Sequence, residues 1–329
     1  MALQHVLTRT SIELALNGEA LVVSLGSRGG RGIRADWLFI DDRRGMEAHR
    51  RNNVHVVGDG PVTLVFAHGF GFDQSIWQCL TDAFAPTYRI VLLDLVGSGR
   101  SDLSKYDFVK YGTLHGHAKD LLEVLAEFTS APVVLIGHSV GAMIGMLAAI
   151  EAPERFSGLV MIGPTPSLID DGDYRGGFKR GDIEALLGSL ESNYLGWANS
   201  IAPSVLGTQA QSGPGADFAD SFCRNAPEIG KHFARVSFLS DHRSELVRVT
   251  MPTLIVQSSD DPFVPLEVGD HMRQMIRESV LATVQSTGHC PHISAPRACI
   301  DAIEAFIKTL PTLADGPSKE TVADNQRDA

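Results

Sequence analysis

One serine of this chain lies in a pattern that can turn its hydroxyl into a nucleophile. The run Gly137-His138-Ser139-Val140-Gly141 follows the apolar segment 133–136 and precedes the alanine-rich segment 142–150. A strand, a G-x-S-x-G turn and a helix in that order hold the serine in a strained turn above the edge of a sheet. Glycines on either side remove Cβ atoms that would collide with the strand and the helix. The pattern predicts that Ser139 acts as a nucleophile.

A serine hydroxyl needs a hydrogen-bonded base, and the base needs a third group that holds its tautomer. Two later loops contain such residues in the chain order serine, acid, histidine. Asp261 follows the expected strand 253–257, and His289 follows the expected strand 280–284. The carboxyl ends of parallel strands are where catalytic side chains gather in open sheets. We therefore expect His289 to be the general base and Asp261 to be the acid that orients it.

Each of these two assignments has a competitor in the sequence. Asp260 precedes Asp261 directly and could be the acid, and Asp170 or Asp171 could serve in a rearranged triad. His292 lies three residues after His289 and could be the base, although a histidine in such a loop can also have a purely structural role. The sequence leaves these alternatives open.

The loop 67–75 is the expected source of the second oxyanion donor. It is glycine-rich and follows the expected strand 63–66, where this kind of site takes one backbone amide. We expect the N–H groups of Phe70 and Val140 to form the oxyanion hole, with the dipole of the helix after Ser139 adding to the stabilisation. His68 in the same loop is expected to be structural. The glycine-containing segment 94–102 lacks G-x-G-x-x-G, so it predicts a turn and no nucleotide cofactor.

Short apolar runs alternate with helix-length amphipathic segments, as in a parallel sheet covered by helices on both faces. The alternation stops between residues 164 and 250, where helical patterns follow one another without a strand, and this insertion should form an all-helical lid. The expected strands are 53–57, 63–66, 89–94, 133–136, 158–162, 253–257 and 280–284. The expected helices are 75–84, 114–129, 140–152, 183–190, 194–206, 229–239, 267–276 and 297–310.

Both ends of the chain differ in composition from the part between them. Residues 1–52 contain eight arginines and no lysine, and we expect them to be a poorly ordered extension without function. Residues 311–329 are polar and lack periodicity, which predicts a disordered tail. The catalytic domain is expected to span residues 53–310.

Composition excludes several classes of partner. The 329 residues are 44% hydrophobic and 20% charged, as in an ordinary globular protein, and the formal net charge is -11. Because this balance leaves no basic excess for phosphates, neither nucleic acid nor an anionic membrane is expected as a partner. No apolar run approaches the roughly 20 residues of a membrane span. Four cysteines without paired spacing favour reduced thiols and a cytoplasmic location, and they offer no metal site.

Five segments of the chain resemble those of a known group of enzymes. The segments HGFGFDQSIW at 68–77, DLVGSGRSD at 94–102, GHSVGAMIG at 137–145, FLSDHR at 238–243 and GHCPH at 288–292 carry the resemblance. They are similar to those of the α/β-hydrolase superfamily, and within it to the RsbQ-type bacterial hydrolases and the related plant strigolactone and karrikin receptors. Such proteins usually begin close to the first strand, so residues before Met46 are expected to be an appendage or the product of an upstream start codon.

The resemblance implies the triad Ser139, Asp261 and His289, the oxyanion donors Phe70 and Val140, and a V-shaped four-helix lid over a deep apolar pocket. It also implies a role in stress signalling with a PAS-domain phosphatase or sensor protein as partner. The lid sequence contains aromatic residues that could line an apolar pocket, and no more than about half of them are expected to face it. Four pocket candidates are Phe178, Tyr194, Trp197 and Phe238.

The function expected from these observations is hydrolysis of a small apolar ester or lactone through an acyl-serine intermediate, without a metal or cofactor. Related reactions of the same triad, such as carbon–carbon bond hydrolysis and perhydrolysis, are not separated by sequence. The alternative from another class is a ligand-binding signalling module that turns over rarely and contacts a protein partner through its lid.

Overall fold

The protein is described by a computed structural model. The structure describes residues 10–16, 19–25, 47–207, 221–222 and 226–310. The chain divides into two compact units, Met1–Glu47 and Ala48–Ala329.

The first unit contains a β-hairpin. Strand β1 (Thr10–Leu16) pairs antiparallel with β2 (Glu19–Leu25), and Thr10 lies opposite Leu25. Two aliphatic-rich segments joined by a short connection suit such pairing. This differs from the poor order expected for the whole of residues 1–52. The other residues of that extension before Glu47 lie outside the described part of the chain, as does the tail 311–329.

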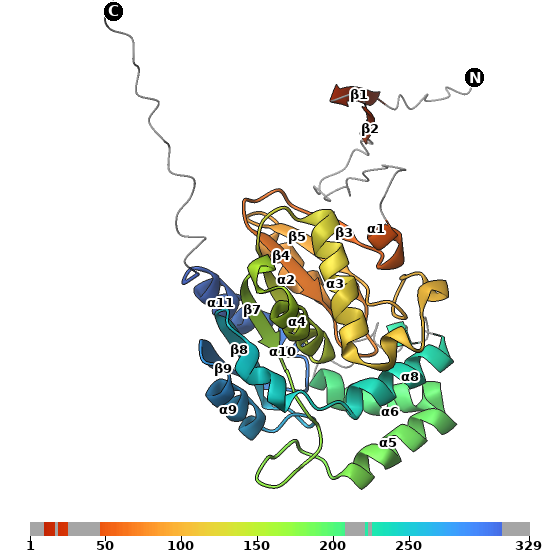
Figure 1. Cartoon of the computed structure of the whole chain (residues 1–329), viewed down its shortest axis with the longest axis vertical. Helices are drawn as coiled ribbons and strands as arrows, with labels where there is room; N and C mark the ends of the chain where they lie inside the picture. The colour runs from red at the N-terminus through yellow and green to blue at the C-terminus, as the bar shows by residue number, and fades with distance from the viewer. Residues whose placement is uncertain (1–9, 17–18, 26–46, 208–220, 223–225, 311–329) are drawn as a thin grey trace, which may run out of the picture. The chain divides into compact units, whose positions relative to one another are not determined.

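A seven-stranded sheet forms the centre of the second unit, in the order β3-β5-β4-β6-β7-β8-β9 (Figure 1). Strand β3 is antiparallel to β5, and every other neighbouring pair is parallel. The strands are β3 (His55–Val57), β4 (Thr63–Ala67), β5 (Arg89–Leu93), β6 (Val133–His138), β7 (Phe156–Ile162), β8 (Thr253–Asp260) and β9 (Ser279–Thr287). The mostly parallel sheet predicted from the sequence is confirmed.

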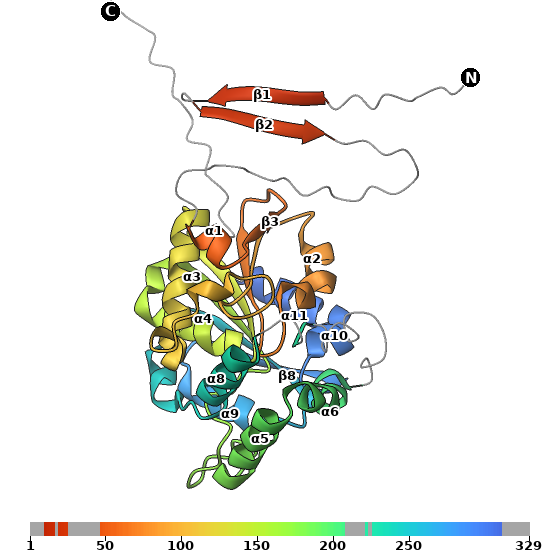
Figure 2. The same ribbon diagram turned by 90° about the vertical axis from the view of Figure 1, so that its right-hand side faces the viewer.

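Helices cover both faces of this sheet (Figures 1 and 2). Alternate strand residues point to opposite faces, so Leu64 and Phe66 enter one hydrophobic core and Val65 enters the other. The first core contains side chains of α2 (Gln78–Phe84), α10 (Pro291–Ser294) and α11 (Pro296–Ile307). The second contains those of α3 (Leu114–Phe128), α4 (Val140–Glu151) and α9 (Leu266–Met275).

The second compact unit begins earlier in the chain than expected. Helix α1 (Glu47–Arg51) lies within the predicted extension, but Ala48 and Arg51 are buried against α3. The Arg51 guanidinium pairs with Asp120 at 3.5 Å and with Glu123, and the Ala48 N–H donates to Glu127. The boundary predicted at residue 53 therefore moves to residue 48. The cause is a contact between segments about 70 residues apart, which local sequence pattern does not reveal.

The insertion between β7 and β8 is helical, as the sequence predicted. Its described helices are α5 (Arg180–Ser192), α6 (Tyr194–Leu206) and α8 (Pro227–Phe238), and a 3-10 helix, Arg243–Arg248, follows them. Residues 208–220 and 223–225, between α6 and α8, lie outside the described part. The fourth lid helix therefore stays a prediction. Among the described residues, no helix combines the length and apolar character that crossing a bilayer requires.

Candidate active site

Ser139 lies in a strained turn between β6 and α4. Its φ of 52° is positive, one of only two such values among described residues other than glycine. A Cβ on Gly137 would lie 2.5 Å from the Ala142 backbone, and one on Gly141 would lie 2.4 Å from the Ala67 carbonyl oxygen. Both glycines are therefore required by close backbone packing, and together they hold the Ser139 side chain at the carboxyl end of the sheet.

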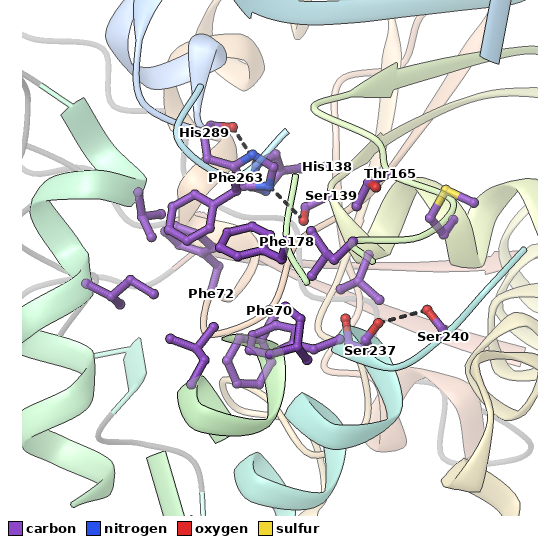
Figure 3. Close-up of a pocket in the computed structure, with 18 of the residues that line it drawn as sticks. Phe70, Phe72, His138, Ser139, Thr165, Phe178, Ser237, Ser240, Phe263 and His289 are labelled. Carbon is purple, nitrogen blue, oxygen red and sulfur yellow. Dashed lines mark hydrogen bonds between the residues drawn. The ribbon is translucent and has the colours of Figure 1, made fainter. Parts of the chain in front are cut away.

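A hydrogen-bonded relay joins three side chains at this edge. The Ser139 Oγ lies 2.9 Å from His289 Nε2, and His289 Nδ1 lies 2.7 Å from Asp261 Oδ2. The other Asp261 oxygen accepts the backbone N–H groups of Phe263 at 2.8 Å and Val264 at 3.2 Å. With Asp261 as the acceptor, Nδ1 carries the proton and Nε2 is free to take the serine proton. Figure 3 shows His289 above Ser139 in the pocket.

The competing acids lie elsewhere. Asp260 is exposed at the end of β8, whereas the Asp261 side chain has no exposed surface. Asp171 forms an ion pair with Arg243 at 2.8 Å, and Asp170 accepts the Gly177 N–H. None of these three carboxylates has a contact with His289 among the interactions in the described part of the chain.

His292 lies behind the relay rather than in it. Its ring is buried 4.8 Å from the Trp77 ring, and neither of its nitrogens has a hydrogen-bond partner among the described residues. Burial, together with the neighbouring His289, lowers the pKa of His292 to about 3. A neutral imidazole packed in this way fits a structural role.

Two backbone N–H groups in the described residues are the free donors expected of an oxyanion hole. In the described part of the chain, neither the Phe70 nor the Val140 N–H donates to another protein atom. Val140 is the first residue of α4, where helix N–H groups have no partner within the helix. His68 shapes the loop that carries Phe70, because it accepts the Leu95 N–H at Nε2 and donates from Nδ1 to the Gly69 carbonyl.

The segment 94–102 is a turn that ties loops together. The Asp94 carboxylate accepts the backbone N–H groups of Gln74 and Arg100, each at 2.9 Å, and the side-chain amide of Asn53 at 2.8 Å. This buried carboxylate is fully engaged with the loops beside β4 and β5, which matches the structural role expected for the segment.

A pocket opens over Ser139, between the sheet and the lid (Figure 3). About 810 Å³ of space is not filled by protein atoms here, a volume that includes the open mouth of the pocket. Its walls are mainly apolar. The lining residues are Phe70, Phe72, Leu114, His138, Ser139, Val140, Met143, Thr165, Leu168, Phe178, Ile183, Leu186, Trp197, Ile201, Val205, Ser237, Phe238, Ser240, Phe263 and His289.

Three of the four predicted pocket aromatics line this pocket, and Tyr194 does not. The Tyr194 ring packs at 4.4 Å from Phe222, and its hydroxyl lies against Gly230, where an added Cβ would be 2.1 Å away. Its position at the start of α6 directs it between lid helices. Sequence reasoning missed Phe263, which follows the acid by two residues, and the hydroxyl residues Ser237 and Ser240, for which spacing offered no signal.

Three buried side chains near the base are of metal-ligating type. Candidate ligand atoms of His138, Cys290 and His292 all lie within 4.8 Å of one another. However, His138 Nε2 lies 3.1 Å from the His289 carbonyl oxygen, to which it can donate. Burial lowers the pKa of His138 and raises the pKa of the Cys290 thiol, so both stay neutral. These neutral side chains therefore fit a packing role that supports the main chain at His289 better than they fit a metal site.

The lid also contacts the loop that carries the base. The Val205 carbonyl, in the last turn of α6, accepts the His289 backbone N–H at 2.8 Å. Gly207 follows with φ of 59°, and a Cβ there would lie 2.3 Å from the Thr287 carbonyl oxygen. The position of α6 and that of His289 are therefore directly linked.

The fold and the site define the class of protein. The sequence profile of the alpha/beta hydrolase family matches residues 64–302, and the chain belongs to this family. It is an esterase-type hydrolase.

Three similar proteins place the chain more closely. A probable esterase of Oryza sativa subsp. japonica is 38% identical over 80% of this chain and 96% of its own length. A karrikin insensitive 2 receptor of Petunia hybrida is 36% identical over 78% of this chain and 94% of its own. The solved structure of a hydrolase from Oleispira antarctica is 37% identical, with a TM-score of 0.77, and covers 80% of this chain and 97% of that one.

Proposed function

We propose that the chain hydrolyses a small, largely apolar ester or lactone, with Ser139 as nucleophile, His289 as general base and Asp261 as the orienting acid. The observation that carries the proposal is the continuous relay from Ser139 Oγ through the His289 ring to the buried Asp261 carboxylate, with separations of 2.9 and 2.7 Å.

The proposed reaction has two halves. Ser139 Oγ attacks the carbonyl carbon while its proton passes to His289 Nε2, and the resulting oxyanion accepts the N–H groups of Phe70 and Val140. The C–O bond to the leaving alcohol breaks as His289 returns the proton to that oxygen. Water then loses a proton to His289 and attacks the acyl carbon. The bond between that carbon and Ser139 Oγ breaks, His289 returns the proton to Oγ, and the acid is released.

The pocket supports the substrate class. Phe70, Phe178, Trp197, Phe238 and Phe263 surround the space in front of Ser139 and provide no charged group for an ionic substrate. Burial of apolar substrate surface against these rings would provide most of the binding free energy.

Substitution of Ser139 tests the proposal. Wild-type protein should cleave short-chain p-nitrophenyl esters and gain one covalent adduct at Ser139 with a fluorophosphonate, detected by intact mass. Ser139→Ala should reduce kcat to the background rate and prevent the adduct, because the Ser139 Oγ is the atom that forms the acyl bond. Esterase activity retained in Ser139→Ala would refute the assignment.

A second candidate is a signalling module in which the same pocket binds a ligand and the lid contacts a protein partner. We propose that this partner is a PAS-domain phosphatase or sensor and that the two proteins meet in the cytoplasm. The similarity to a protein named as a receptor favours this candidate. A cytoplasmic location is supported by free thiols at Cys79, Cys290 and Cys299. Charge reversal at Lys179, Arg180 and Glu184 of the lid should abolish partner capture but retain ester turnover; capture that persists would argue against this surface.

A further inference from the structure

The wall of the pocket contains one hydroxyl group without a partner. Ser237 lies in the last turn of α8 and lines the pocket, and its Oγ has no hydrogen bond within the described part of the chain. The other hydroxyls of the wall are engaged. Thr165 donates to the Ser167 carbonyl at 2.8 Å, and Ser240 donates to the Ser237 carbonyl at 2.8 Å.

Ser237 lies away from the reacting atoms. Figure 3 shows Ser237 and Ser240 next to each other, away from His289 and Ser139. A serine in a helix can satisfy its hydroxyl by donating to a carbonyl one turn earlier. Here no such bond forms, so the Ser237 Oγ–H remains able to donate to a molecule in the pocket.

The surroundings make this hydroxyl a determinant of specificity. Phe70 and Phe238, which line the same pocket, are apolar, so an apolar substrate would leave the Ser237 hydroxyl desolvated without a partner, which is unfavourable. A substrate with a hydrogen-bond acceptor at that point would instead satisfy it. Sites that hydrogen-bond a substrate discriminate strongly against analogues that lack the matching group.

We propose that Ser237 is a specificity-determining residue that recognises an oxygen acceptor in the substrate, separated from the scissile ester by an apolar segment. This rests on the proposed ester hydrolysis at Ser139 and narrows its substrate class from plain apolar esters to esters or lactones with a second, remote oxygen function such as an ether, a carbonyl or a ring oxygen.

An oxygen scan tests the assignment. One probe series is p-nitrophenyl hexanoate and its analogues in which an ether oxygen replaces a single methylene, taken in turn along the acyl chain. A second series makes the same replacements in the alcohol half of hexyl acetate, and its hydrolysis is measured by the release of acid. Each kcat/KM is divided by the rate of hydroxide-catalysed hydrolysis of the same ester, which removes differences in intrinsic reactivity.

In the wild type, at least one oxygen position should be preferred over its all-carbon counterpart. Ser237→Ala should reduce that preference roughly three- to tenfold, mainly through KM, as expected for one neutral hydrogen bond. Ser237→Thr, which keeps a hydroxyl, should restore it. Ser200→Ala in α6 is the control, because the Ser200 hydroxyl donates to the Trp197 carbonyl and the residue does not line the pocket, and it should leave the ratio between the paired esters unchanged.

The same pairs are compared for binding to Ser139→Ala and to Ser139→Ala combined with Ser237→Ala, by calorimetry. If no ester is cleaved but the oxygen preference in binding depends on Ser237, the proposed reaction fails and the role of Ser237 stands. If no position is preferred in either assay, or the preference survives Ser237→Ala, the role of Ser237 is refuted whether or not esters are cleaved.

Discussion

Two neighbouring aspartates at the end of β8 differ sharply in their surroundings. Asp261 accepts two backbone N–H groups and the His289 ring, and its side chain is fully buried. Asp260 is exposed, and its backbone carbonyl, not its carboxylate, accepts the Gly288 N–H. At the residue scale, the site therefore distinguishes two chemically identical side chains by position alone.

This difference predicts the outcome of a matched pair of substitutions. Asp261→Asn should lower kcat by roughly 10³- to 10⁴-fold, because an amide in place of the carboxylate no longer stabilises the imidazolium or the correct tautomer. Asp260→Asn should retain kcat within about twofold. Steady-state kinetics with p-nitrophenyl acetate decides, and a greater loss in Asp260→Asn would move the acid to that residue.

At the scale of elements, the end of α6 is packed against the loop that carries the base. The Val205 carbonyl accepts the His289 N–H, and Gly207 approaches the Thr287 carbonyl too closely for any side chain. Helix α6 thus contributes to the placement of His289 as well as to the pocket wall. A shift of the lid would displace His289 relative to Ser139.

Gly207→Ala is predicted to impair turnover from a distance. The alanine Cβ would collide with the Thr287 carbonyl oxygen, and the positive φ of this position is unfavourable for alanine. Helix α6 and the loop that carries His289 must therefore move apart. We expect kcat to fall about tenfold or more, since small displacements of catalytic groups are costly. The measurement is kcat together with the melting temperature.

Gly188→Ala in α5 is the matched control. Gly188 lies in the helix interior, and a Cβ there would meet nothing within 4 Å. This change should leave kcat unchanged and stabilise the protein by up to about 1 kcal/mol through helix propensity. Equal effects of the two substitutions on kcat would contradict a specific link between α6 and His289.

At the scale of the whole molecule, the start of the hydrolase unit is defined by α1. Removing residues 1–45 should leave the melting temperature and esterase activity unchanged, because Ala48 and Arg51 stay in place. Removing residues 1–52 should lower the free energy of unfolding by roughly 1–3 kcal/mol, since the buried Asp120 loses its contact with Arg51 and keeps Lys110 as its cationic partner. Urea denaturation of both shortened proteins measures this, and equal stability would return the boundary to residue 53.

Buried neutral histidines predict how stability depends on pH. Burial lowers the pKa of His117 and His292 to about 3, and that of His138 well below its ordinary value of 6.5. These rings stay neutral in the folded state, while in the unfolded state they bind protons as pH falls below about 6.5. Folding stability is therefore lost on acidification, by about 1.4 kcal/mol for each ring between pH 7.5 and pH 5.5.

His292→Phe tests this dependence at one site. Phenylalanine keeps an aromatic ring against Trp77 and removes the titrating group. The decrease in unfolding free energy between pH 7.5 and pH 5.5 should be about 1.4 kcal/mol smaller than in the wild type. Denaturant titrations at the two pH values give the comparison, and an unchanged decrease would show that His292 titrates alike in both states.

Local pattern alone was enough to predict the sheet, the helices around it and the turn at Ser139. Alternation of apolar runs with amphipathic segments sets the sheet and its helices, and glycines at 137 and 141 mark a turn where only close backbone packing fits. The order of serine, acid and histidine along the chain also follows from strand ends that the sequence makes visible.

Contacts between distant segments decided the rest. Which aspartate meets His289, whether Tyr194 faces the pocket or a neighbouring lid helix, and whether Arg51 belongs to the unit all depend on the relative placement of segments far apart in the chain. The unpartnered Ser237 hydroxyl emerges only once the pocket wall is assembled. Sequence periodicity records which face of an element is buried, but not against which partner, so the tertiary structure alone determines these features.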